Sequence, residues 1–256
     1  MPDTDLPLLI RTAKDAAEIA LNYWQSDQRI DHKDGGSPVS EGDYAVDAFL
    51  KQTLCAARPN YGWLSEETED DKVRLSHDTV FIVDPIDGTR AYVAGEKTWA
   101  ISIAVVQNGQ PSAGVVYLPA REKLYAAAIG MGAHLNGDAI ACGTRIDPDG
   151  ATVLAPKPSL SPEWWAGEVP AFERHFRTSL AYRFCLVAEG RFDVMLTLRN
   201  AWEWDIAAGT LIATEAGAAV TDRNGDTLSL NSVCAQSKGI FTASPALHQD
   251  LIKRYN

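Results

Sequence analysis

Residues 79–89 read TVFIVDPIDGT, and the structure expected for the first half of the chain is built around this segment. Its first five residues are β-branched or aromatic, which is typical of a buried strand that ends at Asp84. The proline after Asp84 fixes its own φ, and the later glycine permits a tight turn, so Asp84 and Asp87 can converge on one point. With the Ile86 carbonyl between them, they offer hard oxygen ligands that suit Mg²⁺ rather than zinc. The alternative is a surface turn with capping aspartates.

Two further acidic segments lie far from this turn in the sequence. Residues 64–68 (LSEET) place Glu66 after a short apolar run, and residues 202–209 (WEWDIAAG) place Asp205 at the start of a helix. A helix N-terminus presents free N–H groups to an anion, and the small residues after Asp205 would let a ligand approach closely. The alternatives are a solvated acidic face for the first segment and a plain N-cap for the second.

The composition excludes several classes of function. The chain has 256 residues and a net charge of −11, so it lacks the basic surface that duplex nucleic acid or anionic lipid would require. An anionic substrate would therefore need bound cations. The four cysteines and five histidines show no zinc-type spacing. Because no signal peptide and no membrane-spanning run is evident, we expect a cytoplasmic protein.

The periodicity predicts two lobes that form one catalytic unit. Helices on an antiparallel meander are expected for residues 1–145, and an α/β lobe for residues 146–256, with the site between them. Residues 6–24 have helical spacing, and Ser40 with Asp43 resembles a capping box for a helix that ends near residue 57. The other expected elements are strands at 79–83, 99–106, 113–118, 124–130, 151–155, 192–196 and 239–243, and helices at 181–190 and 205–216.

The segments DPIDGT (84–89) and WDIAAG (204–209) resemble the two signatures of the inositol monophosphatase superfamily of Mg²⁺-dependent phosphatases. Lys33 and the PVS-x-x-D pattern at residues 38–43 resemble its N-terminal element. The resemblance covers about residues 6–245. It implies a layered α/β/α/β/α sandwich and the hydrolysis of a small phosphate monoester, with two or three Mg²⁺ ions per site. It also allows a homodimer.

The resemblance implies roles for single residues. Thr89, with Glu66, would activate the attacking water, and Asp43 would support that end of the site. The N–H groups of Gly88 and Thr89, and the helix that starts at Asp205, would cradle the phosphate. The implied metal ligands are Glu66, Asp84, the Ile86 carbonyl, Asp87 and Asp205.

The branch of the superfamily is predicted from shorter patterns. Residues 64–67 (LSEE) and 183–190 (RFCLVAEG) resemble bacterial 3′(2′),5′-bisphosphate nucleotidases, which makes 3′-phosphoadenosine 5′-phosphate the first expected substrate. Inositol phosphate is second. Residues 90–92 (RAY) are closer to the histidinol-phosphatase branch, which makes histidinol phosphate third. Arg90 and Arg183 would hold a second phosphate, or would be surface arginines. A non-catalytic regulatory protein would show a broken ligand set, and this set is intact.

Overall fold

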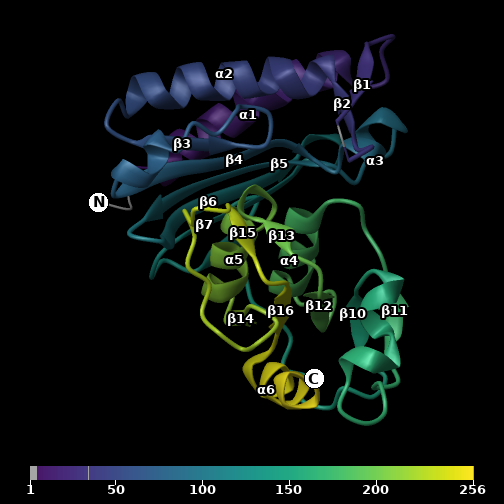
Figure 1. Ribbon diagram of the computed structural model, residues 1–256. Coiled ribbons are helices and arrows are strands. Elements are labelled where there is room, and N and C mark those ends of the chain that lie inside the picture. The colour runs from purple at the N-terminus through teal and green to yellow at the C-terminus, as the bar shows by residue number, and fades with distance from the viewer. Residues whose placement is uncertain (1–4, 34, 256) are drawn as a thin grey trace.

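The computed structural model describes residues 5–33 and 35–255 as five stacked layers (Figure 1). Two helices cover the outer face of a seven-stranded sheet, two more lie between that sheet and a five-stranded sheet, and a last helix covers the far face of the smaller sheet. The predicted α/β/α/β/α sandwich is confirmed. The helices are α1 (Leu6–Tyr23), α2 (Glu41–Ala57), the short α3 (Thr89–Val93), α4 (Leu180–Ala188), α5 (Glu203–Glu215) and α6 (Pro245–Arg254).

The larger sheet is the antiparallel meander predicted for the first half of the chain. Its strands lie in chain order, and only β3 and β4 run parallel to each other. Because of this parallel pair, the residues that follow β3 lie beside the end of β4. The strands are β3 (Gly62–Ser65), β4 (Thr79–Asp87), β5 (Ala100–Gln107), β6 (Gln110–Leu118), β7 (Lys123–Ala128), β8 (Ala133–Leu135) and β9 (Asp138–Ile140).

The prediction that the strand ends at Asp84 is wrong, because β4 continues through a bulge to Asp87. Asp84 pairs with Ser102 and Asp87 pairs with Ala100, so three steps along β4 oppose two along β5. The bulge accommodates Pro85, which has no N–H to give to the ladder. Since residues 100 and 102 lie on one face of β5, the two aspartates lie on that same face.

Alternate residues of the central strands enter two different cores. Phe81 and Val83 pack against α1 and α2, whereas Val80 and Ile82 pack against α4 and α5. The helix predicted at residues 6–24 is confirmed and ends at Tyr23. The face predicted from its spacing, Leu9 to Ala20 with Trp24, is buried in the first of these cores except for Trp24, which is the half-buried C-cap residue. The buried residues of that face are Leu9, Ala13, Ala16, Ala17 and Ala20.

The smaller sheet has the strand order β11-β10-β12-β16-β14, in which β10 runs parallel to β11 and β12 and the other pairs are antiparallel. Leu154 and Met195 face α4 and α5, and Val153 and Leu196 face α6. The predicted strands of the second half are β10, β12 and β16. The bounds are β10 (Thr152–Leu154), β11 (Glu173–His175), β12 (Val194–Thr197), β14 (Ala219–Thr221) and β16 (Ile240–Ala243).

The two predicted lobes share one core, because α4 and α5 pack against both sheets. The predicted boundary at residues 145/146 falls in an irregular segment between β9 and β10, and it stays a prediction. The strands that were not predicted mostly have two or three residues, which are too few to show a clear period. The helices α3 and α6 were not predicted either. Within the described ranges no helix is long and apolar enough to cross a membrane. The small paired strands are β1 (Ile30–His32) with β2 (Pro38–Ser40), and β13 (Ala201–Trp202) with β15 (Gln236–Ser237).

Candidate active site

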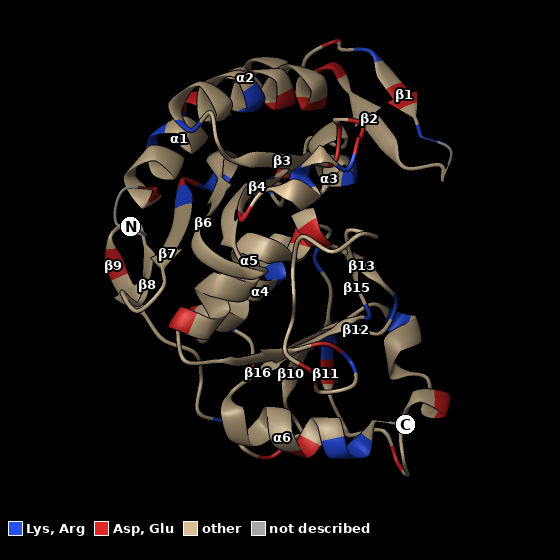
Figure 2. Ribbon diagram, turned by 60° about the vertical axis from the view of Figure 1, so that its left-hand side comes forward, with Lys and Arg blue, Asp and Glu red and all other residues tan. Residues whose placement is uncertain are grey.

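Three carboxylates from distant parts of the chain meet at the N-terminal end of α5. One oxygen each of Glu66, Asp84 and Asp205 lies within 4.8 Å of the other two. Figure 2 shows acidic residues in red at the start of α5 and near the ends of the neighbouring strands. The structure therefore brings together three of the carboxylates that the sequence predicts as ligands of Mg²⁺. We call these three residues the carboxylate cluster.

The parallel pairing of β3 and β4 places the first two of these side chains. Ser65 pairs with Val83, and the N–H of Glu66 donates to the carbonyl of Val83 at 3.2 Å. Glu66, the residue after the end of β3, therefore lies beside Asp84 of β4. Neither carboxylate needs a long loop to reach the site, because both follow directly from the strand register.

Asp205 lies in the first turn of α5, as predicted, but the alternative that it is the N-cap is wrong. Trp202 is the N-cap residue, with φ −71° and ψ 146°, and no side chain caps this helix end. The carboxylate of Asp205 is thus available to the cluster. Its negative charge also interacts favourably with the positive end of the helix dipole.

The small residues after Asp205 are explained by packing rather than by ligand access. A Cβ added to Gly209 would lie 2.7 Å from the ring of Phe184 in α4. A Cβ added to Gly114 of β6 would lie 3.1 Å from the Cα of Ala208. Small side chains therefore let α5 approach both α4 and β6. The expectation that they also let an anion approach the start of the helix stays a prediction.

The carboxylate cluster is electrostatically strained without a cation. Withdrawal from water, followed by repulsion from Glu66 and Asp87, raises the pKa of Asp84 and of Asp205 well above the ordinary value. A divalent cation would reverse this effect, because it favours the charged form of each group. The geometry and the charges thus fit the same kind of ligand.

Lys33 supplies a positive charge at the edge of the cluster. Its Nζ donates to Oε1 of Glu66 at 2.8 Å and to Oε1 of Glu67 at 2.7 Å. Burial raises the pKa of Glu67 to about 7, and the charge of Glu66 adds to this shift. The alternative that this acidic run is a solvated face is wrong for Glu66 and Glu67, although Glu69 is exposed.

Thr89 connects two of the predicted site residues. Its Oγ1 lies 3.2 Å from Oδ1 of Asp43 and 3.1 Å from the carbonyl of Ile86, and the hydroxyl can donate to either. Asp43 also completes the predicted capping box with Ser40, which is confirmed. Burial raises the pKa of Asp43 to about 6. Gly88, with φ +94°, forms the turn from which Thr89 projects.

Asp87 is held by the N-terminus of α4, a contact that the sequence did not predict. Its carboxylate accepts hydrogen bonds from Ser179 Oγ at 2.7 Å and from the N–H groups of Leu180 and Ala181 at 3.2 and 2.6 Å. Burial nevertheless raises the pKa of Asp87 to about 6. Asp87 lines the same pocket as the carboxylate cluster, and its role as a ligand stays a prediction.

A pocket of about 550 Å³ opens above these carboxylates. Arg183 is buried in its wall: Nε donates to the carbonyl of Arg177 at 2.6 Å, and the guanidinium lies 4.4 Å from the ring centre of Phe176. Burial lowers the pKa of Arg183 to about 10. The alternative of a surface arginine is therefore wrong for Arg183, whereas Arg90 lines the pocket and is exposed.

Two further residues of the pocket wall were missed by sequence reasoning. Arg199 and Trp202 lie just before α5 and line the same pocket. The indole of Trp202 is 42% exposed and stacks on that of Trp204, with ring centres 4.6 Å apart and planes at 8°. The W-x-W pattern at residues 202–204 is the one signal in the sequence for this stack.

Comparison with known proteins gives a consistent result. The family model described as "Inositol monophosphatase family" matches residues 2–256. The chain is 32% identical to a histidinol-phosphatase of Mycobacterium tuberculosis, over 100% of this chain and 99% of that protein. It is 35% identical to an inositol-1-monophosphatase of Rhizobium meliloti, over 73% of each.

Solved structures agree with this match. The extragenic suppressor protein suhB of Bartonella henselae has a TM-score of 0.83 at 25% identity, and the match covers 98% of this chain and 97% of that one. An IMPase of Thermotoga maritima has a TM-score of 0.83 at 26% identity, with 98% and 96% covered. The motifs, the five layers and these likenesses lead to one conclusion: the chain belongs to the inositol monophosphatase family.

Proposed function

We propose that this chain hydrolyses small phosphate monoesters and that Mg²⁺ at the carboxylate cluster supports the reaction. The observation that carries the proposal is the convergence of Glu66, Asp84 and Asp205. This donor set contains only oxygen atoms, which fits a hard divalent cation and not a soft one. Asp87 and the Ile86 carbonyl would complete the ligands of two or three ions.

The reaction needs an oriented water and neutralised phosphate charge. Bound Mg²⁺ would supply positive charge to the phosphate oxygens and lower the pKa of the attacking water. Thr89, whose hydroxyl proton is directed to Asp43 or to Ile86, would use its lone pairs to orient that water. Glu66 would accept the proton of the water. The N–H groups of Gly88 and Thr89 and the first turn of α5 would hold the phosphate.

For the substrate we propose 3′-phosphoadenosine 5′-phosphate. The pocket wall contains three arginines, Arg90, Arg183 and Arg199, which suits a substrate with a second phosphate. The exposed and stacked indole of Trp202 offers a flat surface for an adenine ring. Neither feature is needed for an inositol ring, which has no second phosphate and no aromatic face.

Histidinol phosphate, third in the order expected from the sequence, becomes the second candidate, because a relative whose match covers the whole chain is named a histidinol-phosphatase. Residues 90–92 (RAY) also favour that branch. Against it, the ammonium group of histidinol phosphate would lie in a pocket lined by Arg183 and Arg199, whose positive charges repel it.

The test compares phosphate release from these two esters and from inositol 1-phosphate, with Mg²⁺ and with chelator. We expect turnover with Mg²⁺ only, the highest kcat/KM for the bisphosphate, and loss of that preference in Arg199→Gln and Trp202→Ala. A higher kcat/KM for histidinol phosphate would reverse the substrate assignment. No release from any of the three would favour a non-catalytic protein. The cytoplasmic location and the homodimer stay predictions.

A further inference from the structure

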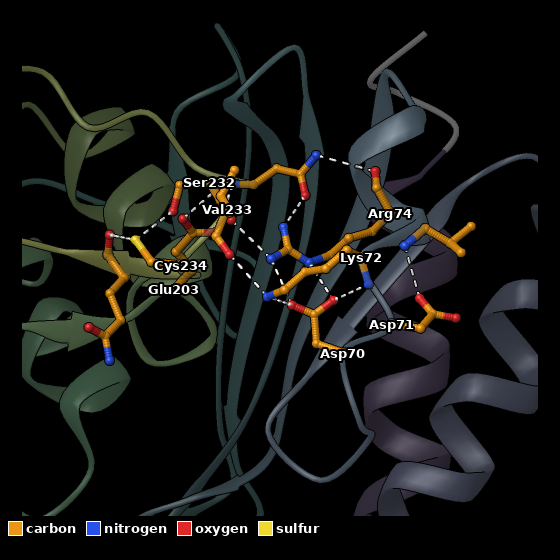
Figure 3. Close-up of polar contacts among 11 residues, drawn as sticks. Asp70, Asp71, Lys72, Arg74, Glu203, Ser232, Val233 and Cys234 are labelled. Atoms are coloured by element: carbon orange, nitrogen blue, oxygen red, sulfur yellow. Dashed lines mark hydrogen bonds and ion pairs between the residues drawn. The ribbon is translucent and has the colours of Figure 1, made fainter.

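Segment 231–237 lies between two parts of the chain that carry members of the carboxylate cluster (Figure 3). On one side it contacts Glu203, the first residue of α5. Oε2 of Glu203 accepts from the N–H of Asn231 at 2.7 Å, and Oε1 accepts from the N–H of Ser232 at 2.9 Å. The N–H of Glu203 donates to the carbonyl of Ala235 at 2.9 Å. Three hydrogen bonds thus tie the first residue of α5 to this segment.

On its other side the same segment contacts Arg74, whose side chain is fully buried. Nη1 of Arg74 donates to Oδ1 of Asn231 at 2.6 Å, and Nη2 donates to the carbonyl of Ser232 at 2.9 Å. The guanidinium also forms a two-bond ion pair with Asp70, at 3.0 and 2.8 Å. Asp70 lies only four residues after Glu66. Segment 231–237 therefore connects the Glu66 segment to the start of α5.

We propose that Glu203 is a positioning residue that holds Asp205 in the carboxylate cluster. Glu203 is fully buried, and a buried carboxylate charge costs stability unless hydrogen bonds offset it, as those from Asn231 and Ser232 do here. It lies two residues before Asp205, in a helix end that no side chain caps. Its bonds to Asn231 and Ser232 fix where the first turn of α5 begins. This inference rests on the proposed role of Asp205 as a metal ligand.

A matched control exists at the other end of the same helix. Glu215, the last residue of α5, accepts from the N–H groups of Gly130 and Gly132, both at 2.8 Å. Like Glu203, it joins α5 to a loop through both carboxylate oxygens. It lies ten residues beyond Asp205, about 15 Å along the helix. Glu215 is less buried than Glu203, so the two can differ in what they contribute to stability, but a purely structural role should leave Mg²⁺ binding unchanged at either end.

The experiment compares Glu203→Gln and Glu203→Asp with Glu215→Gln and Glu215→Asp in the full chain. The Kd of Mg²⁺ is measured by isothermal titration calorimetry without substrate, together with Tm and kcat. Gln removes the charge and can accept only one of the two bonds, whereas Asp keeps the charge but shortens the reach. We expect both Glu203 variants to bind Mg²⁺ about tenfold more weakly, as when the outer partners of metal ligands are removed. Both Glu215 variants should bind as the unaltered protein does, whatever their Tm.

Equal Mg²⁺ binding in the Glu203 and Glu215 variants would overturn the proposal. So would weaker binding in Glu203→Gln alone, because charge and not position would then be the cause. If the Glu203 variants do not fold, Asn231→Gly decides. It keeps the N–H that donates to Glu203 and suits the positive φ of 60°, but it removes the side-chain bond from Arg74 that anchors the segment on its other side. Mg²⁺ should bind more weakly to this variant, and unchanged binding would overturn the positioning role of Glu203. An unaltered protein that binds no Mg²⁺ would overturn the proposed function as well.

Discussion

Nζ of Lys33 lies 2.8 Å from Oε1 of Glu66, so a cation of the chain itself stands at the edge of the carboxylate cluster. Lys33 partly neutralises the cluster and competes with any metal ion for Glu66. Replacement of Lys33 by Gln should therefore destabilise the metal-free protein and stabilise the metal-bound protein. The metal-free protein loses a partner for its carboxylates, whereas the metal-bound protein loses a competitor.

For Lys33→Gln we expect the free energy of unfolding without Mg²⁺ to fall by about 1 kcal/mol, the upper range for partly exposed pairs. Mg²⁺ should bind more tightly than in the unaltered protein. Thermal unfolding in chelator and calorimetric titration measure the two effects. Arg29→Gln, which breaks an exposed pair with Asp31, is the control and should change neither. Weaker Mg²⁺ binding in Lys33→Gln would show that Lys33 supports the metal site instead of competing with it.

Asp87→Asn should lower both turnover and stability. One carboxylate charge near the phosphate is lost, which typically reduces turnover by about 10²–10³. Asn keeps only one oxygen, so the N-terminus of α4 also loses one of the two acceptor atoms for the bonds that Ser179 Oγ, Leu180 N and Ala181 N donate. The control is Ser179→Ala, which removes the N-cap of α4 at a cost of about 1 kcal/mol and leaves the carboxylate in place. Equal loss of turnover in the two variants would mean that Asp87 only holds α4.

Thr89→Ala should reduce kcat by about 10²–10⁴ without changing the Kd of Mg²⁺, because the hydroxyl orients the water and carries no charge. Thr89→Ser keeps the hydroxyl and should retain most of the activity. Turnover at saturating Mg²⁺, measured beside a Mg²⁺ titration, separates the two roles. Reduced Mg²⁺ affinity with unchanged kcat would move Thr89 from catalysis to metal binding.

The metal-free protein should lose stability as the pH rises from 5 to 8. Burial raises the pKa of Asp43 and Asp87 to about 6 and that of Glu67 to about 7. The folded state therefore binds more protons than the unfolded chain in this range, and the stability that these protons provide is lost as the pH passes 6 to 7. Mg²⁺ should consequently raise Tm more at pH 8 than at pH 5. At a hundredfold excess over Kd, a bound ion stabilises the folded state by about 2.7 kcal/mol. A Tm that does not respond to Mg²⁺ or chelator at either pH would contradict the carboxylate cluster.

The sequence predicted those parts of the site that depend on local geometry. Asp84 follows from a strand and a proline, and Asp205 from a helix start, so each could be placed without knowledge of the fold. The contact between Asp87 and Ser179 joins residues that are 92 positions apart, and no local sequence pattern predicts it. The same holds for the bonds of Glu203. In the sequence, Glu203 is only one more acidic residue near a helix N-terminus.

Packing also changed the meaning of residues that the sequence singled out correctly. Ala208 and Gly209 are small because α4 and β6 lie against them, which only the layer order reveals. Arg183 stands in a motif that the sequence identified, but its burial against Phe176 depends on how α4 meets the preceding loop. The sequence therefore predicted the chemistry of these side chains more reliably than the residues that they contact.

The position of α4 and α5 between the two sheets limits how this protein can be divided. All nine residues of α4 are buried. A fragment that ends at residue 145 would leave Val80, Ile82 and the rest of one face of the larger sheet in water. The complementary fragment would expose the opposite sides of both helices. Each fragment would therefore be expected to aggregate. Neither fragment would contain both Asp84 and Asp205. A single proteolytic cut between the lobes should therefore abolish metal binding if the two pieces separate.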